Sequence, residues 1–403
     1  MKRIITLLIL FSFVSSSIFT QNTNLNQGII KQKKYLQKIP YENINGLLIV
    51  PVTINGKMYK FTIDTGSSLA ISDKLFKELN PQVISQKEII DSSDRKKEMK
   101  VIILPELHLE GVTFINTHGV VLHEKSYDFF NLFDCFGIDG IIGSNMLRNS
   151  VIQLDGESKH IIISNDFSQI QKKKSLQSQK MKLTTSQSNP YITVILHKEG
   201  KKAIGDHVLF DSGASDFYKM SMRTYDWLNG RINVTEKAKS EGSFAWGLHG
   251  TFEQQQHLLL NIPELHINDI IFDDITVTTT HTMSHIGVQL TKYGKITLDY
   301  KKKRFYFEPF DSINKEKLSE RSWAILPTLK NDKVVIGIIW DKALESQINI
   351  QDEILSINGF DIRSITVCEY LNSKYTTFSD ELLILELKDI YTKEVKKVEI
   401  KRM

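Results

Sequence analysis

The sequence predicts a mostly β protein with two related lobes followed by a smaller β-rich body. Short apolar runs rich in Ile, Val, Thr and aromatic residues recur along the chain and are typical of strands, while long helical periods are rare. Such runs lie, for example, at 47–54, 191–196 and 295–300. Hydrophobic residues make up 41% of the chain and charged residues 24%, which is ordinary for a globular protein and excludes disorder throughout.

Polar stretches give the expected domain boundaries, and they lie at 21–38, 165–189 and 311–322. They predict lobe 1 at about 40–165, lobe 2 at about 190–310 and a C-terminal body at about 322–403. We interpret the third stretch as a linker, so truncation after Pro309 should leave a folded bilobal core.

Residues 1–20 have the pattern of a secretory signal peptide. Two basic residues precede an apolar segment, and serines follow it at 15–17. We expect cleavage between Ser17 and Gln21, and no later apolar run is long enough for a membrane span. The protein should therefore be exported, to the periplasm or the extracellular space. Its formal net charge of +4 is too small to indicate a nucleic-acid partner.

Three blocks of sequence occur in the same order in both lobes. Residues 62–68 align with 209–215, 104–109 with 262–267, and 151–155 with 295–299. Such a repeat indicates a duplication. It gives Asp64 and Asp211 equivalent positions, each after an apolar strand and before a Gly-containing turn.

Equivalent carboxylates in a duplicated fold can meet at a pseudo-two-fold axis. A single Asp-Thr-Gly or Asp-Ser-Gly segment is most often an ordinary turn, so the prediction depends on the pair. Two carboxylates that close cannot both ionise easily and therefore share a proton. The ionised one can act as a base on water while the protonated one polarises a carbonyl. The sequence thus predicts peptide-bond hydrolysis by Asp64 and Asp211, a chemistry that needs no metal or cofactor.

The segments 63–68, 210–215 and 139–143 resemble those of single-chain aspartic proteases of the retropepsin and pepsin superfamily. The resemblance covers about residues 40–310 and is greatest to bacterial retropepsin-like proteins with a C-terminal PDZ domain. It implies a bilobal, aspartic-protease-like double β-barrel followed by a PDZ-like domain. The residues expected to support the catalytic turns are Thr65, Gly66, Ser67, Ser212 and Gly213.

By the same resemblance, Thr65 and Ser212 make cross-lobe hydrogen bonds, and Ile141-Ile142-Gly143 lies beside the first catalytic turn. Lobe 2 has only 285–288 (His-Ile-Gly-Val) where that apolar segment would recur. The turns also differ in a hydroxyl, because Ser67 in lobe 1 corresponds to Ala214 in lobe 2. We expect the Ser67 hydroxyl to donate to a catalytic carboxylate and lower its pKa.

A flap is a mobile hairpin over the cleft and usually contains Gly. Residues 71–110 of lobe 1 contain no Gly, whereas 242–250 of lobe 2 are rich in Gly and aromatic residues. We therefore place the flap candidate at Gly242, Trp246 and Gly247. An ordinary Gly-rich loop is an alternative of equal weight.

The C-terminal body resembles a PDZ domain over 352–359, a predicted strand that ends in an Asn-Gly turn. PDZ domains bind peptide termini by adding a strand to their sheet, so a peptide is the ligand that this resemblance implies. The usual Gly-rich carboxylate loop is missing, and 322–325 (Ser-Trp-Ala-Ile) occupies its place.

Other polar and sulfur-containing groups are interpreted as structural. His281 and His285 lie four residues apart, but their context is a Thr-rich strand, so we expect no metal site. Residues 301–304 are basic and lie between two predicted strands, where a solvated turn is expected. Cys135 and Cys368 lie in different bodies, and we favour buried free thiols over a bond between them.

The sequence therefore predicts an exported aspartic endopeptidase that acts on a peptide or protein substrate. Because both lobes lie on one chain, a monomer suffices to complete the site. The alternative is a non-catalytic envelope protein that binds peptides with the cleft and the PDZ-like module. The paired Asp-Thr-Gly and Asp-Ser-Gly turns favour the enzyme.

Overall fold

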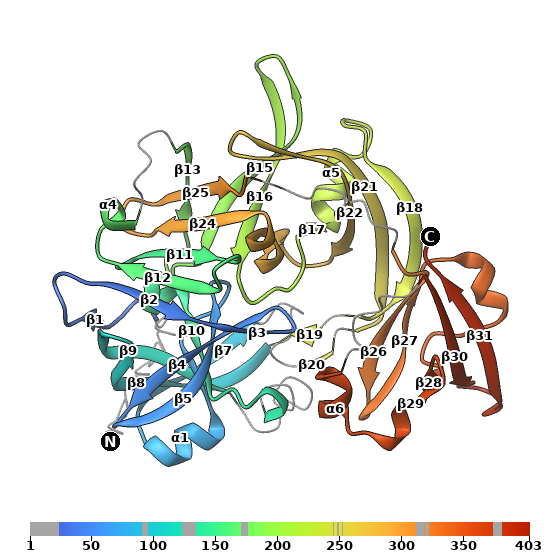
Figure 1. The fold of residues 1–403 in the computed structure, drawn as a ribbon, viewed down its shortest axis with the longest axis horizontal. Helices are drawn as coiled ribbons and strands as arrows, with labels where there is room; N and C mark the ends of the chain where they lie inside the picture. The colour runs from blue at the N-terminus through green and yellow to red at the C-terminus, as the bar shows by residue number, and fades with distance from the viewer. Residues whose placement is uncertain are drawn as a thin grey trace, which may run out of the picture.

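A computed structural model describes residues 24–90, 96–122, 134–170, 176–244, 246–247, 250–251, 253–311, 318, 322–373 and 381–403. The expected signal peptide, and most of the expected linker at 311–322, lie outside the described residues. Figure 1 shows two β lobes with a further β domain beside them. Among the described helices, none is long and apolar enough to cross a membrane. The mostly β fold class predicted from the sequence is confirmed.

Lobe 1 is built on a large sheet with the strand order β1-β9-β6-β10-β5-β4-β8-β7 and with β3 paired to β4. Its elements are β1 (Ile29–Ile30), β3 (Glu42–Ile44), β4 (Leu47–Ile54), β5 (Lys57–Asp64), β6 (Ala70–Ser72), α1 (Asp73–Leu79), β7 (Gln82–Ile90), β8 (Lys96–Leu109), β9 (Val112–Leu122), β10 (Gly140–Gly143) and α3 (Ser144–Leu147). Helix α1 begins at Ser72, whose Oγ accepts a hydrogen bond from the backbone N of Leu75 at 3.1 Å.

Lobe 2 repeats this plan in a sheet of order β14-β15-β16-β23-β17-β22-β21-β18. Its elements are β14 (Lys182–Leu183), β15 (Pro190–Glu199), β16 (Lys202–Asp211), β17 (Tyr218–Ser221), α5 (Met222–Leu228), β18 (Thr235–Gly242), β19 (Trp246–Gly247), β20 (Gly250–Thr251), β21 (Gln255–Ile267), β22 (Ile270–Thr280), β23 (His285–Gly287) and the 3-10 helix η1 (Val288–Lys292). Helix α5, like α1, starts at a serine: Ser221 Oγ accepts from the backbone N of Thr224 at 3.0 Å.

A third sheet, of order β13-β25-β24-β11-β12-β2, joins the lobes. Its strands are β2 (Leu36–Pro40), β11 (Val151–Asp155), β12 (His160–Ser164), β13 (Ser178–Lys180), β24 (Gly294–Asp299) and β25 (Arg304–Pro309), and the short helix α4 (Phe167–Ile170) follows β12. Strands β11 and β24 pair antiparallel with Gln153 opposite Thr297, and Gln153 Nε2 donates to Thr297 Oγ1 at 2.9 Å. These residues are the centres of the repeated blocks, so the duplicated strands meet about a local two-fold axis. One continuous hydrophobic core runs through both lobes and this sheet.

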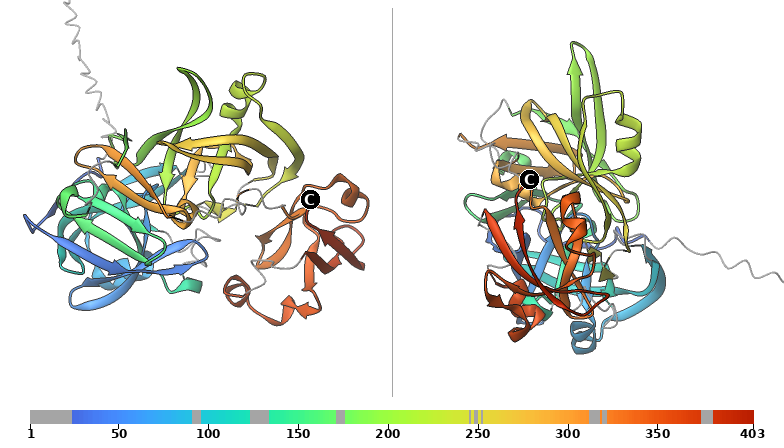
Figure 2. Two further views of the ribbon diagram at one scale, coloured as in Figure 1. Left: turned by 45° about the horizontal axis from the view of Figure 1, so that its top comes forward. Right: turned by 90° about the vertical axis from the view of Figure 1, so that its right-hand side faces the viewer.

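The C-terminal domain lies to one side of the bilobal body (Figure 2). Its sheet has the order β26-β27-β28-β30-β31, with β29 on β28. The elements are β26 (Ile325–Lys330), β27 (Lys333–Ile339), η3 (Lys342–Ser346), β28 (Glu353–Ile357), β29 (Phe360–Asp361), η4 (Ile362–Ser364), α6 (Val367–Leu371), β30 (Leu382–Lys388) and β31 (Val395–Lys401).

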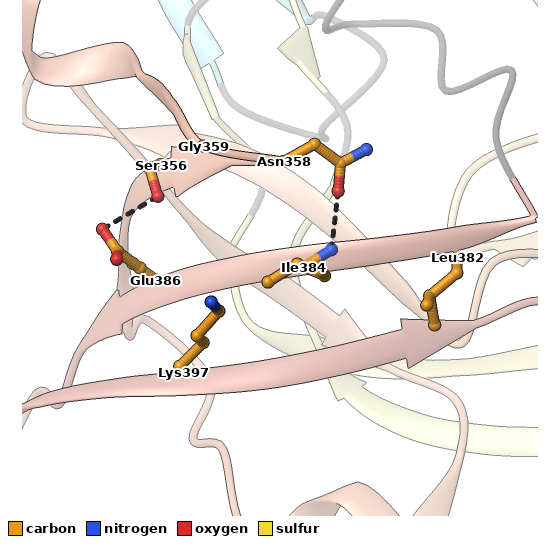
Figure 3. Close-up of a pocket in the computed structure, with 7 residues that line it drawn as sticks. All are labelled: Ser356, Asn358, Gly359, Leu382, Ile384, Glu386 and Lys397. Carbon is orange, nitrogen blue, oxygen red and sulfur yellow. Dashed lines mark hydrogen bonds between the residues drawn. The ribbon is translucent and has the colours of Figure 1, made fainter.

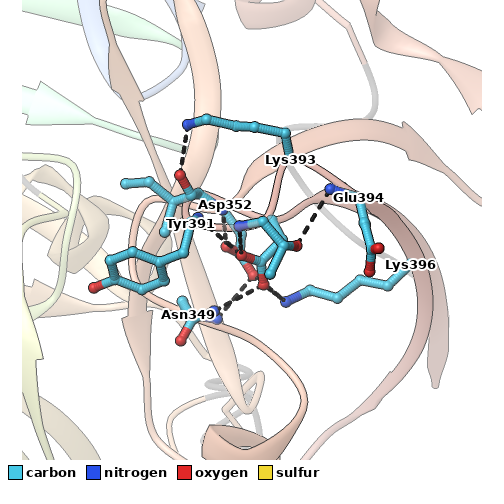
Figure 4. Close-up of polar contacts among 9 residues, drawn as sticks. Asn349, Asp352, Tyr391, Lys393, Glu394 and Lys396 are labelled. Carbon is cyan, nitrogen blue, oxygen red and sulfur yellow. Dashed lines mark hydrogen bonds and ion pairs between the residues drawn. The ribbon is translucent and has the colours of Figure 1, made fainter.

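A buried ionic network holds the turns of this domain together (Figure 4). The Asp352 side chain is fully buried, and its Oδ2 lies 2.7 Å from Lys396 Nζ. Lys396 also pairs with Asp389 at 2.6 Å, and Asn349 Nδ2 donates to the same Asp389 oxygen at 3.0 Å. Asp352 Oδ1 accepts from the backbone N of Ile390 at 2.8 Å. The Asp of the predicted PDZ-like segment therefore has a structural role, because a buried carboxylate needs such partners.

The C-terminal domain packs directly against lobe 2. Leu259 of β21 forms a buried apolar cluster with Ile338 and Trp340. The backbone N of Ser243 donates to Gly337 O at 3.0 Å, and the backbone N of Ile339 donates to Ser240 Oγ at 3.1 Å. Strand β27 thus runs beside β18, so the domain is docked as well as linked.

A disulfide between Cys135 and Cys368 ties the same domain to lobe 1. The interpretation of these residues as free thiols was wrong. They are separated by 233 positions, and only the docking of α6 against lobe 1 brings them together. Asn45 Nδ2 supports this contact by donating to Leu371 O at 2.7 Å. The C-terminal domain therefore bridges the two lobes.

Candidate active site

Both candidate catalytic turns are built in the same way. Strands β5 and β16 end at Asp64 and Asp211, and a short strand lies parallel to each of them. In lobe 1 Gly143 of β10 is opposite Asp64, and in lobe 2 Gly287 of β23 is opposite Asp211. A Cβ at Gly143 would lie 2.2 Å from the backbone carbonyl carbon of Ser68. The segment 285–288, which matches the lobe 1 motif only in part, therefore packs against its turn as 140–143 does in lobe 1.

The two carboxyl groups lie against each other. Gly66 N donates to Asp64 Oδ1 at 2.8 Å, and Gly213 N donates to Asp211 Oδ1 at 2.9 Å. A Cβ at Gly66 would lie 2.6 Å from Asp211 Oδ2, and one at Gly213 would lie 2.6 Å from Asp64 Cγ. Only glycine fits at these two positions, which is the physical reason for the Asp-x-Gly pattern in both turns.

The surroundings of Asp64 favour its protonated form. Burial raises the pKa of Asp64 well above its ordinary value, and the charge of Asp211 and a hydrogen bond to it raise it further. The backbone N–H groups of Gly66 and Ser67 act in the opposite direction without cancelling this rise. A carboxyl whose pKa is raised beside a second carboxyl is the arrangement on which general acid and general base catalysis by such a pair depends.

Thr65 and Ser212 lock the turns together across the lobes. Thr65 N donates to Ser212 Oγ at 3.1 Å, and Ser212 N donates to Thr65 Oγ1 at 3.0 Å. Each hydroxyl in turn donates across the interface, Thr65 Oγ1 to Phe210 O at 2.6 Å and Ser212 Oγ to Ile63 O at 2.9 Å. Both side chains are fully buried, so these bonds fix the relative position of the two carboxylates.

We expect Thr65→Val and Ser212→Ala each to lower the free energy of unfolding by about 1–3 kcal/mol, because each leaves buried partners unsatisfied. Denaturant unfolding followed by circular dichroism measures this effect. Thr193→Val changes an exposed threonine of β15 and serves as the matched control. Values within about 0.5 kcal/mol of the control for both variants, the usual range for surface substitutions, would contradict the locking role.

Ser67 faces the Asp64–Asp211 pair, hereafter the dyad, through its backbone and not through its hydroxyl. Its Oγ donates to Ser68 O at 3.1 Å, while its N–H acts on Asp64. The expected donation from the Ser67 hydroxyl to a carboxylate was therefore wrong, because the turn directs the main chain toward Asp64.

Accordingly, Ser67→Ala should leave the pH dependence of kcat/KM unchanged, since alanine retains the N–H. A pH–rate profile of the variant beside that of the wild type measures this. A displacement of about one pH unit, equivalent to about 1.36 kcal/mol, would show that the hydroxyl does reach the carboxylates.

Three supporting residues were missed by the sequence analysis. Ser144 Oγ donates to Thr65 O at 2.7 Å and lies 2.7 Å from the hydroxyl of Tyr300, whose pKa burial raises. Asn189 Nδ2 donates to Gly66 O. Ser144 directly follows the apolar-apolar-Gly segment and could have been found by that position, whereas Asn189 lies 123 positions from its partner and gave no signal.

The described residues of the flap candidate lie at the end of β18 and in the β19–β20 hairpin. Gly242 ends β18, and Trp246–Gly247 form β19, which pairs with β20 (Figure 1). A Cβ at Gly242 would lie 2.0 Å from Gly337 O of the C-terminal domain. The base of this hairpin is therefore held by β27.

A separate cavity of about 470 Å³ lies on the C-terminal domain (Figure 3). Its lining residues are Ser356, Asn358, Gly359, Leu382, Ile384, Glu386 and Lys397. Ser356 Oγ donates to Glu386 at 2.9 Å, and the backbone N of Ile384 donates to Asn358 Oδ1 at 2.7 Å. None of these residues belongs to the catalytic turns, so this cavity is distinct from the dyad.

Within the described part of the chain, no cluster of three or more His, Cys, Asp or Glu is placed to hold a metal.

Comparison with known proteins gives one family match and a set of similar solved structures. Residues 50–146 match the family model described as aspartyl protease. The structure is similar to a retropepsin-like aspartic protease from Rickettsia conorii, with 18% identity, 33% of this chain and 95% of that chain covered, and a TM-score of 0.24. It is also similar to conglutin gamma, a basic 7S globulin from lupine seeds, with 10% identity, 68% and 95% coverage, and a TM-score of 0.41. No curated protein matches the chain.

The family match contains Asp64, its Thr-Gly turn and the β10 segment beside it. It relates lobe 1, which carries the first carboxyl, to the aspartyl protease family. The second carboxyl, that of Asp211, lies in the duplicated turn of lobe 2, which the family match does not include.

Proposed function

We propose that this protein is an aspartic endopeptidase in which Asp64 and Asp211 activate one water molecule against a peptide bond. The observation that carries the proposal is the close approach of the two carboxyls, each of which lies against the glycine of the opposite turn, held by the reciprocal Thr65 and Ser212 contacts. A peptide-binding cleft without catalysis has no need of a shared proton at its centre.

The hydrolysis proceeds by general acid and base catalysis. Asp211 takes a proton from the water as its oxygen attacks the scissile carbonyl carbon, and Asp64 gives its proton to the carbonyl oxygen. When the tetrahedral intermediate collapses, the C–N bond breaks and the amine takes the proton from Asp211. Asp64 recovers its proton from a hydroxyl of the intermediate. The pair returns to its starting state without a covalent intermediate.

We further propose that the enzyme is exported, to the periplasm or the extracellular space. The basic, apolar and small-residue pattern of 1–20 supports export. The Cys135–Cys368 disulfide is a second support, because such bonds persist mainly in oxidising compartments.

The C-terminal domain is proposed to be PDZ-like, with peptide termini as its ligands. Its Asn358-Gly359 turn follows β28 with positive φ at both residues, and α6 lies between β29 and β30. These features support the predicted segment 352–359 as the centre of the domain.

The test is incubation of the purified mature protein with a mixed peptide library, followed by sequencing of the products. Cleavage that a pepstatin-like inhibitor blocks is the expected result. Peptides that bind without being cleaved under any condition would favour the rival function, a non-catalytic peptide-binding protein of the envelope.

A further inference from the structure

The sheet face of lobe 2 that carries Asp211 also carries charged residues that the Asp64–Asp211 pair does not use. Side chains alternate between the two faces of a strand. In β16, Phe210 is fully buried in the core, so Leu209 and Asp211 point to the opposite face. In β23, Ile286 lies in the same core, and His285 is opposite Leu209. His285 therefore lies on the face that carries Asp211.

Lys219 belongs to the same face. It is opposite His285 in the pairing of β17 with β23, and its neighbours Tyr218 and Met220 lie in the core. Its Nζ lies 5.0 Å from the ring centre of Phe244, which follows β18 at the base of the flap candidate. Lys219 is thus placed between the catalytic turn and that hairpin.

Asp216 connects the two basic groups. Its Oδ2 lies 3.1 Å from His285 Nε2 and 3.3 Å from Lys219 Nζ. The side chains remain 24%, 16% and 19% exposed for Asp216, His285 and Lys219, so all three keep access to solvent or to a ligand.

The contacts of His285 favour an imidazolium. One ring nitrogen faces the Asp216 carboxylate, and the other lies 3.4 Å from Met283 O, so both nitrogens face acceptors. Burial alone would lower the pKa of His285, but Asp216, and to a smaller extent Asp211, raise it above the ordinary value, against the opposing charge of Lys219. With His285 protonated, the cluster has two positive charges and one negative charge.

Lobe 1 has buried apolar residues at the equivalent positions. Ile141 is opposite Thr62 in β5, as His285 is opposite Leu209, and Ala70 is opposite Ile141, as Lys219 is opposite His285. Ile141 and Ala70 are buried in an apolar cluster. The equivalent positions of the two lobes therefore differ in charge, and the basic residues belong to lobe 2.

We propose that Lys219, His285 and Asp216 form a cationic subsite beside Asp211 that binds a carboxylate side chain of the substrate, an Asp or Glu near the scissile bond. Asp216 holds the two basic groups in place, and the surplus positive charge recognises the carboxylate. This inference rests on the proposed peptidase function only in naming the ligand as a substrate.

The test uses pairs of peptides that differ only in Glu or Gln at one position. Binding is measured by calorimetry to the Asp64→Asn protein, and kcat/KM is measured with the wild type. At one position Glu should be preferred by about tenfold, the factor that 1.4 kcal/mol gives. Lys219→Met and His285→Gln should each reduce this preference to near one. Lys202→Met removes an exposed lysine at the far end of β16 and should retain it.

The preference should also weaken as the pH rises through the raised pKa of His285, because the cluster then loses its surplus charge. The groups facing His285 are Asp216, Lys219 and Asp211, and of these only Asp211 belongs to the dyad. Equal binding of Glu and Gln peptides at every position would overturn the subsite. Selective binding of Glu peptides without cleavage by the wild type would keep the subsite and overturn the peptidase function.

Discussion

Asp64→Asn and Asp211→Asn should each lower kcat/KM for peptide hydrolysis by about 10³-fold or more. The two carboxyls act as one unit, so each single variant and the double variant should lose similar amounts of activity. An asparagine can neither accept the proton of water nor hold the shared proton. Initial rates on a defined peptide, with the wild type and the three variants at equal concentration, measure the effect.

The matched control for this experiment is Asp269→Asn, which changes an exposed carboxylate in the turn between β21 and β22. It should retain wild-type activity. Circular dichroism and thermal unfolding establish that the dyad variants remain folded. A single dyad variant with near-wild-type activity would show that Asp64 and Asp211 do not act as a pair.

Replacing both Cys135 and Cys368 by serine should destabilise the protein by roughly 2–4 kcal/mol, the usual range for a native disulfide. The bond closes a loop of 233 residues and anchors the C-terminal domain on lobe 1, while β18 and β27 anchor it on lobe 2. Loss of the disulfide should therefore increase the motion of the C-terminal domain relative to lobe 1 and lower the unfolding temperature. Differential scanning calorimetry and limited proteolysis with a non-specific protease measure the two effects.

The single variants Cys135→Ser and Cys368→Ser provide the control, because each breaks the same bond. They should match the double variant in unfolding temperature, and reduction of the wild type should reproduce their value. An unfolding temperature that is the same with and without the bond would mean that the contacts of β27 alone fix the domain.

Much of the site could be predicted because it depends on local pattern and on duplication. The repeated blocks 151–155 and 295–299 pair about a local axis, and the same axis relates the two Asp-containing turns. The glycines that follow them are required because each lies against the opposite carboxyl. These features are repeated along the sequence, so one copy identifies the other.

Features that depend on tertiary contact could not be predicted in this way. The partners Cys135 and Cys368 lie in different domains, and their pairing follows from docking of α6. The Ser67 hydroxyl and the backbone N–H at that position cannot be distinguished from residue type alone. From the sequence, His285 was considered as a metal ligand and as the first residue of the segment 285–288. Its position beside Leu209, Lys219 and Asp216 could not be predicted, because it follows from strand register.

The most direct test of the central mechanism is a single turnover in H₂¹⁸O with enzyme in excess over a cleavable peptide. Direct attack by a water activated between Asp64 and Asp211 predicts ¹⁸O in the new C-terminal carboxyl of the product. Peptides containing Asp64 and Asp211, recovered from the enzyme after digestion and analysed by mass spectrometry, should carry no label. Label in either aspartate would reveal a covalent acyl intermediate and contradict the account.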